Sequence, residues 1–173
     1  MGKAREIFDG NPCVRVKSDL PEWICLNVSP DLESKELVAN FFRSELSDLP
    51  DGYCESLATA IEELLSNAIE HGCRMDPQCG IELSLVRAGH SIVLHIRDAG
   101  SGFALGEVKH AAFNNPPDDP LRHMEYRSKQ GMRAGGFGIM LVQQIADELV
   151  YNEAGNEVLL VKYLQPDSVK SHS

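Results

Sequence analysis

Three separate stretches of the sequence contain residues whose types and spacing could do chemistry. In the first, Glu63, Asn67 and His71 stand four residues apart, a spacing that places side chains on one face of an α-helix. The amide oxygen of Asn67 suits Mg²⁺, which prefers oxygen ligands, and the carboxylate of Glu63 could polarise a hydroxyl or a water. His71 could contact a phosphate. A solvated helix face is the alternative, and residues 62–71 alone do not decide between them.

The second stretch begins where a predicted β-strand ends. Asp98 follows an apolar segment and precedes Gly100 and Gly102, which allow the backbone to approach a flat ligand closely. A buried aspartate there could accept a hydrogen bond from an exocyclic amine, which would select adenine over guanine. The alternative is an ordinary Asp-x-Gly turn, which is common in proteins.

The third stretch is Gly135, Gly136, Phe137 and Gly138, directly before the apolar part of a predicted helix. Glycines at a helix start expose the free amides of the first turn, where the helix dipole also favours an anion. Phosphate groups could therefore bind there. The segment is not a Walker A loop, because no Gly-Lys-Ser/Thr follows, and a flexible lead-in to a helix stays open as the alternative.

The elements between these stretches follow from apolar periodicity. Residues 23–28 read as a strand, and Asp31 or Ser34 as the N-cap of a helix with apolar positions from Leu37 to Leu46. A second helix is predicted over 53–71, with Gly72 as its C-cap. Further elements are two strands at 81–86 and 91–96, a helix at 137–147, and strands at 148–152 and 157–164. Hairpins with segregated helices predict an α+β two-layer sandwich.

Length and composition set the limits of this interpretation. A chain of 173 residues predicts one domain, which we place at residues 23–165, after a leader at 1–22 and before a polar tail at 166–173. A net charge of −10 disfavours nucleic acid as the main partner, although one bound nucleotide needs only a local field. No apolar run approaches the roughly 20 residues of a membrane helix, so we expect no membrane association.

Cysteine usage predicts the compartment. The five cysteines are odd in number and form no CxxC motif, which predicts free thiols and a cytoplasmic location. A metal site made of His71, Cys73 and Cys79 is disfavoured, because no second ligand pair with finger-like spacing exists.

The order of the three stretches resembles that of the GHKL (Bergerat-fold) ATP-binding superfamily, and within it the anti-sigma-factor serine kinases. The N-box is residues 63–72, the G1 box is Asp98-x-Gly100-x-Gly102-Phe103 and the G2 box is Gly135-Gly136-x-Gly138-Ile139. The resemblance covers about residues 23–164. It implies a mixed, mostly antiparallel sheet with helices packed on one face.

The resemblance also implies roles for single residues. Asn67 would hold Mg²⁺, Glu63 would be the catalytic base, and Asp98 would bind the adenine amine. Gly100 and Gly102 would shape the base pocket, and residues 135–138 with His71 would contact the phosphates. Residues 104–134 would form an ATP lid, with Arg133 near the terminal phosphate. The final hairpin departs from the pattern, since it turns through 155–157 as Gly-Asn-Glu where many relatives have Gly-Thr.

The resemblance implies a serine/threonine kinase that uses ATP and Mg²⁺, phosphorylates a STAS-domain anti-sigma antagonist, and sequesters a sigma factor or a response-regulator-like protein. Two alternatives stay open. One is a kinase-inactive, nucleotide-gated binding module. The other is a detached histidine kinase ATP-binding domain, which is disfavoured because only about 22 residues precede the first predicted strand. A homodimer is possible, and the helix carrying residues 37–42 could contribute to it, although an ordinary core helix is favoured.

Overall fold

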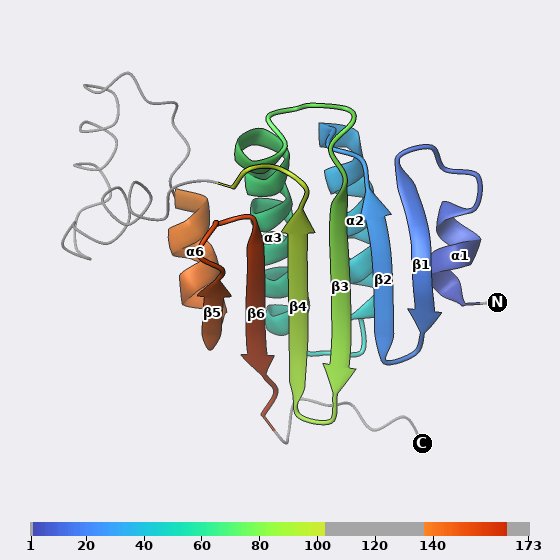
Figure 1. Cartoon of the computed structure of the whole chain (residues 1–173). Coiled ribbons are helices and arrows are strands. Elements are labelled where there is room, and N and C mark those ends of the chain that lie inside the picture. The colour runs from blue at the N-terminus through green and yellow to red at the C-terminus, as the bar shows by residue number, and fades with distance from the viewer. Residues whose placement is uncertain (1, 103–136, 166–173) are drawn as a thin grey trace.

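A computed structural model describes residues 2–102 and 137–165, which form a six-stranded sheet with helices (Figure 1). The helices are α1 (Lys3–Phe8), α2 (Leu32–Glu45), α3 (Asp51–Asn67), the π-helical turn η1 (Ala68–Gly72) and α6 (Phe137–Ile145). The strands are β1 (Val14–Leu20), β2 (Trp23–Val28), β3 (Ile81–Ala88), β4 (Ser91–Asp98), β5 (Glu148–Tyr151) and β6 (Glu157–Tyr163). The α+β prediction is confirmed.

The sheet has the strand order β1-β2-β3-β4-β6-β5, and each of these neighbouring pairs is antiparallel. The expected mixed sheet is therefore wrong for the described residues. Short connections explain the difference: β3 and β4 join through a two-residue turn, with Ala88 opposite Ser91, and such turns link only antiparallel strands. Strand β4 lies between β3 and β6, so its C-terminal end at Asp98 lies between the first residues of those two strands.

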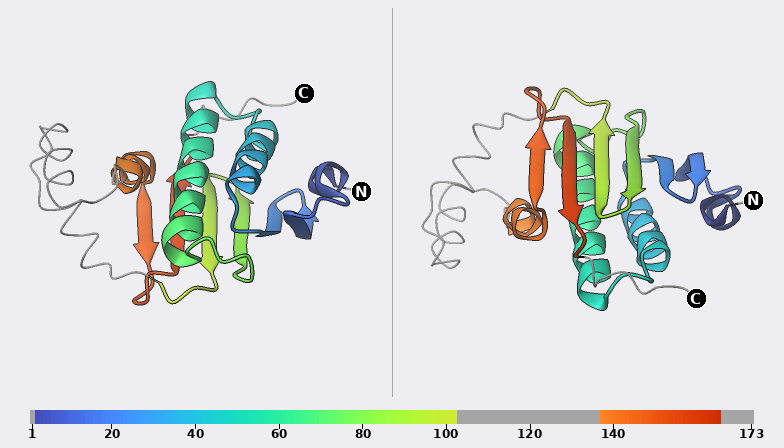
Figure 2. Two further views of the ribbon diagram at one scale, coloured as in Figure 1. Left: turned by 90° about the horizontal axis from the view of Figure 1, so that it is seen from above. Right: turned by 90° about the horizontal axis from the view of Figure 1, so that it is seen from below.

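Helices α2 and α3 cover one face of the sheet, as predicted (Figure 2). Alternate strand residues face them, for example Leu26, Leu83 and Leu94, and each of these is at most 1% exposed. From α3, Ile61 and Leu65 are fully buried in the same core. Asp31 caps α2 by accepting a hydrogen bond from the backbone N–H of Ser34 at 2.7 Å. This packing fixes the position of α3 relative to the strand ends.

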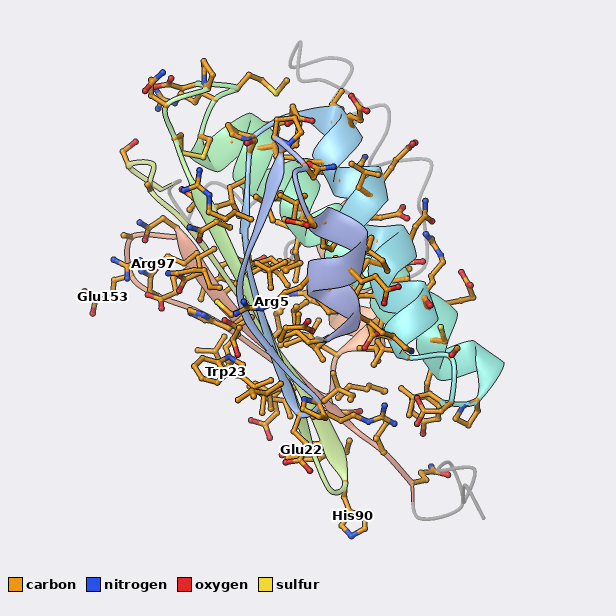
Figure 3. The ribbon with its side chains drawn as sticks, turned by 90° about the vertical axis from the view of Figure 1, so that its right-hand side faces the viewer. Arg5, Glu22, Trp23, His90, Arg97 and Glu153 are labelled. Atoms are coloured by element: carbon orange, nitrogen blue, oxygen red, sulfur yellow. A yellow bond between two sulfur atoms is a disulfide. The ribbon has the colours of Figure 1, made fainter. Side chains whose placement is uncertain are left out.

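The opposite face of the sheet carries side chains that point away from α2 and α3, among them Trp23 and Arg97 (Figure 3). Trp23 is 47% exposed. Within the described ranges, no helix combines the length and hydrophobicity that a membrane span requires.

Residues 1–22 were expected to be a leader, and this expectation is wrong for residues 3–20. They form α1 and β1, and β1 pairs with β2 along its length. Ala4, Phe8 and Val14 are buried, and the ring of Phe8 meets that of Phe41 edge-on with centroids 5.1 Å apart. The segment is ordered because its apolar residues are buried beside α2, which local sequence patterns do not reveal.

Helix α2 packs into the core rather than presenting an apolar face to a partner. Val38, Phe41 and Phe42 are each at most 3% exposed. These residues are therefore not available for a homodimer interface, and the favoured prediction of a core helix is confirmed.

Candidate functional site

Helix α3 ends at the first candidate residues. Glu63 and Asn67 lie one turn apart in its last part, and both are half-buried. The side-chain nitrogen Nδ2 of Asn67 is buried and has no hydrogen-bond partner among the residues that the structure describes. Buried polar groups nearly always find a partner, so this amide nitrogen is a hydrogen-bond donor with capacity for a further acceptor.

The end of the helix differs from the prediction. The α-helix stops at Asn67 and continues as the π-helical turn η1, in which the N–H of Cys73 donates to the carbonyl of Ala68 at 2.7 Å. Gly72 is not the expected left-handed C-cap; positive φ angles occur instead at Arg74 and Met75. Single π turns inside α-helices are frequent at functional sites.

Gly72 is needed because the chain has no room for a side chain there. A β-carbon on Gly72 would stand 2.4 Å from the carboxyl carbon of Asp98. A β-carbon on Gly100 would stand 2.0 Å from the carbonyl oxygen of Gly72. The backbone after the first stretch therefore lies directly against the second stretch.

Asp98 is the last residue of β4, and it is only 4% exposed. Its carboxylate accepts a hydrogen bond from the N–H of Gly100 at 2.9 Å. Burial raises the pKa of this carboxyl, because the charged form loses solvation, and the backbone hydrogen bonds offset only part of that effect. Asp98 is thus a buried acceptor, as an adenine-binding residue would be.

Asn67 and Asp98 line one cavity of about 20 Å³, together with Tyr151 from β5 and Asn156 from the final turn. This volume holds about one water molecule. Tyr151 is half-buried, and burial raises the pKa of its phenol to about 12. The structure therefore brings the first two stretches together at one point beside the final hairpin.

Asn156 is the residue that sequence reasoning missed. Its side-chain nitrogen donates to the carbonyl oxygens of Asp98 and Gly100, both at 3.3 Å, and its own N–H donates to Asn152 Oδ1 at 3.1 Å. The departure at residues 155–157 is thus the place where the last hairpin binds the second stretch. The only sequence signal is the Gly-Asn pair, which marks a turn but not its distant partners.

Position 102 requires glycine for two reasons. Its φ is +76°, a conformation that favours glycine, and a β-carbon there would stand 1.8 Å from the carbonyl oxygen of Ala154. The second stretch therefore packs closely against the last hairpin at both Gly100 and Gly102.

The third stretch reaches the first one through Gly138. Gly138 is the second residue of α6, and a β-carbon there would stand 2.0 Å from Oε2 of Glu63. Figure 1 shows α6 beside β5, at the edge of the sheet opposite α1. The candidate residues Gly135, Gly136 and Arg133, and the expected lid at 104–134, lie outside the described residues; of Phe137 only the backbone, at the start of α6, is described.

The sequence profile of the histidine kinase-like ATPase domain matches residues 28–162 of this chain. The chain belongs to the histidine kinase-like ATPase domain family. The match spans all three stretches, and it confirms the superfamily resemblance.

The chain is similar to curated members of this family from bacteria. It is 25% identical over 116 residues to a serine-protein kinase RsbW of Oceanobacillus iheyensis, covering 66% of this chain and 68% of that protein. It is 28% identical over 112 residues to an anti-sigma F factor of Anoxybacillus flavithermus, covering 62% and 68%. A serine-protein kinase RsbW of Staphylococcus epidermidis is 25% identical over 120 residues, covering 68% and 70%.

The described residues fit the nucleotide that the name of this ATPase domain family implies. The buried amide of Asn67 lacks a partner, the buried carboxylate of Asp98 lies within the same cavity, and three glycines leave no room for side chains around them. His71, in contrast, is exposed on η1 and does not line this cavity. Its expected contact with a phosphate gains no support from its position.

The prediction of five free thiols is wrong in one respect. Cys73 and Cys79 form a disulfide, while Cys13, Cys25 and Cys54 are not disulfide-bonded. The pair is close because the turn after η1 folds back, bringing the two α-carbons within 5.5 Å. Cys73 and Cys79 are thus bonded to each other, and residues 2–102 and 137–165 contain no group of three or more His, Cys, Asp or Glu side chains arranged to hold a metal ion.

Proposed function

We propose that this member of the histidine kinase-like ATPase domain family binds Mg·ATP and phosphorylates a serine or threonine of a STAS-type anti-sigma antagonist. We propose that it also sequesters a sigma factor or a response-regulator-like protein. The observation that carries the proposal is the meeting of Asn67 and Asp98 at one cavity, with Glu63, one helical turn before Asn67, lying against Gly138 at the start of α6. The kinase and anti-sigma parts are supported by the similarity to a serine-protein kinase RsbW and an anti-sigma F factor.

We propose that the residues at this cavity meet different parts of the nucleotide. Its volume of about 20 Å³ is far below the several hundred Å³ that a small-molecule site usually occupies, so in this proposal it receives only a small part of the nucleotide. Asp98 would accept a hydrogen bond from the exocyclic amine of adenine. The amide oxygen of Asn67 would hold Mg²⁺.

Bound Mg·ATP would supply the phosphoryl group and neutralise part of its charge. Glu63 would take the proton of the acceptor hydroxyl and orient its oxygen for attack. The amides of residues 135–138 would line the triphosphate, and Arg133 would steady the transferring group. Positioning and electrostatics carry most of the catalysis in phosphoryl transfer, so the spacing of these groups matters more than their reactivity.

The proposal also covers the cellular location of the protein and its oligomeric state. We propose a cytoplasmic location, where sigma factors and their antagonists act. A homodimer also stays a proposal, although the buried residues of α2 cannot form its interface.

A phosphotransfer assay tests the proposal. The full chain is incubated with radiolabelled Mg·ATP and a panel of STAS-domain proteins, and label is mapped by mass spectrometry. We expect label on one partner serine or threonine, lost with Glu63→Ala, while ATP affinity of that variant stays within severalfold by calorimetry.

The assay also distinguishes the alternatives. ATP binding without label on any partner would favour a nucleotide-gated binding module. Label on a histidine of a partner would favour a detached histidine kinase domain. Unchanged transfer by Glu63→Ala would remove Glu63 from the mechanism.

A further inference from the structure

The Cys73–Cys79 disulfide closes a short loop between η1 and β3. Neither the proposed chemistry nor the family motifs use these two cysteines. The loop directly follows the turn that carries the backbone from Asn67 to the buried carboxylate of Asp98. The contacts at the two ends of this loop therefore determine which residues a change in the disulfide can affect.

Both ends of the bridged loop hold the segment that follows β4. At one end, Gly72 precedes Cys73 and lies against Asp98 and Gly100. At the other end, Gly80 follows Cys79, and its carbonyl accepts a hydrogen bond from the N–H of Ala99 at 3.0 Å. Residues 98–100 thus contact both Gly72 and Gly80, the two residues that flank the disulfide-bonded loop.

The loop also contains strained backbone. Arg74 and Met75 have φ angles of 53° and 60°, which residues with side chains rarely adopt. Such conformations persist only where the surroundings enforce them. The covalent bridge from Cys73 to Cys79 closes this turn, together with hydrogen bonds from the N–H of Met75 to the carbonyl of Ile69 and from the N–H of Asp76 to the carbonyl of Cys73, both at 2.9 Å. Cleavage of the bridge removes one of these constraints.

The two bridged cysteines differ in exposure. Cys73 is 3% exposed, whereas Cys79 is half-buried and lines a cavity of about 440 Å³ that also borders Asp98 and Ala99. The Cys79 side of the bridge is therefore the more exposed one, and a reductant would approach from that side.

The free Cys13 lines the same cavity but is poorly suited to attack. Burial and the nearby Asp31 carboxylate raise the pKa of its thiol, which keeps it protonated, and the thiolate is the nucleophile in disulfide exchange. An external dithiol is the better reductant.

We propose that Cys73 and Cys79 form a reversible thiol–disulfide modification site that controls nucleotide affinity, with the oxidised form binding ATP more tightly. In the step, a dithiol reductant attacks Cys79, the S–S bond breaks, and Cys73 leaves as a thiolate that takes a proton. The second sulfur of the reductant then displaces Cys79, so two electrons and two protons pass to the protein and the reductant becomes a disulfide. Disulfides in a reducing compartment are usually transient or redox-sensing.

The proposal rests on the proposed nucleotide site, and the experiment separates the two. The full chain is prepared without reductant and after reduction, and alkylation with mass spectrometry counts its thiols. We expect three free thiols before reduction and five after it. Mg·ATP affinity is then measured by calorimetry, and we expect it to fall about fivefold or more on reduction, the lower end of usual coupling between sites.

Two variants serve as comparisons. Cys73→Ser/Cys79→Ser should bind like the reduced protein under both conditions, and Cys13→Ser should respond to reduction like the unmodified chain. Hydrogen exchange without nucleotide gives a readout independent of binding: amides at residues 98–100 should exchange faster after reduction. If the double variant does not fold, the reduced unmodified protein still answers the question.

Each result has a definite meaning. Five thiols before reduction, or equal ATP affinity with equal exchange at 98–100 in both forms, would overturn the modification site. A different result is faster exchange at 98–100 on reduction with no ATP binding in either form. It would overturn the nucleotide site and the control of its affinity, but it would still support an effect of the disulfide on residues 98–100.

Discussion

The carboxylate of Glu63 lies directly over the α-carbon of Gly138, where a β-carbon would stand 2.0 Å from Oε2. These residues are far apart in the sequence, one near the end of α3 and the other at the start of α6. Their contact joins the proposed catalytic base to the helix start that we propose as the phosphate seat. The spacing between them therefore depends on a glycine.

Gly138→Ala should lower phosphotransfer without unfolding the protein. The clashing atom is the end of a flexible side chain, so Glu63 can rotate away while the backbone stays in place. We expect stability within about 0.5 kcal/mol of the original, and activity reduced about tenfold to a hundredfold, as misplacement by 1 Å can cost. Thermal unfolding and the labelled-ATP assay measure the two effects. Unchanged phosphotransfer in Gly138→Ala would show that the contact between Gly138 and Glu63 does not position the catalytic base.

Gly100→Ala should destabilise the fold itself, because the new β-carbon would meet the backbone oxygen of Gly72 at 2.0 Å. Backbone cannot rotate away as a side chain can, so we expect a loss of about 1–3 kcal/mol in urea unfolding. Gly80→Ala is the matched control, since nothing lies within 4 Å of its β-carbon position. Equal stability of the two variants would contradict the close approach.

Asp98→Asn should weaken ATP binding and change how stability depends on pH. The raised pKa of Asp98 means that the folded state binds its proton more tightly than the unfolded state does. Its contribution to stability is therefore present below the ordinary value of 3.8 and is lost as the pH rises through the raised value. We expect the Tm of the variant, relative to the original, to be higher at neutral pH than in acid.

Calorimetry completes the test of Asp98. Losing a hydrogen bond to a charged group costs about 1.5–3 kcal/mol, or roughly tenfold to a hundredfold in ATP affinity. A variant that binds ATP as well as the original chain would exclude Asp98 from adenine recognition. If the Tm difference between Asp98→Asn and the original chain did not change with pH, the carboxyl of Asp98 would not be the source of the predicted pH dependence of stability.

Asn67→Ala should leave the nucleotide-free protein nearly as stable as before. The buried Nδ2 of Asn67 has no partner among the described residues, so the substitution breaks no hydrogen bond there, and we expect a change within about 1 kcal/mol. The rise in Tm that Mg·ATP causes should disappear, however, because binding to the folded state is what raises it. A large loss of stability without nucleotide would show instead that Asn67 serves the fold.

Phe8→Ala tests whether the N-terminal segment belongs to the domain. Phe8 is 4% exposed and packs on Phe41, so its loss should cost about 3–5 kcal/mol in urea unfolding. Ile7 lies on the same helix but is 52% exposed, and Ile7→Ala should change stability by about 0.5 kcal/mol or less. Similar small effects for both would mean that α1 contributes little.

Several features were predictable because they follow from nearby residues. Apolar periodicity placed α2, α3, the β3–β4 hairpin and the final strands close to their observed bounds, and Asp31 was one of two expected caps. The errors concern contacts between distant residues. Gly72 resembled a C-cap, yet its role is to let the backbone pass Asp98, and nothing near it in the sequence indicates that neighbour.

The amino-acid sequence by itself determined the residues able to do chemistry and the elements that carry them, because helix periodicity, strand alternation and turn glycines are local properties. Only the tertiary structure decided that Asn67 and Asp98 share a cavity, that Asn156 binds the carbonyls beside it, and that Cys73 meets Cys79. It also decided that residues 3–20 complete the sheet and core. These relationships depend on how helices and strands pack together, and packing is set by the whole core rather than by any one segment.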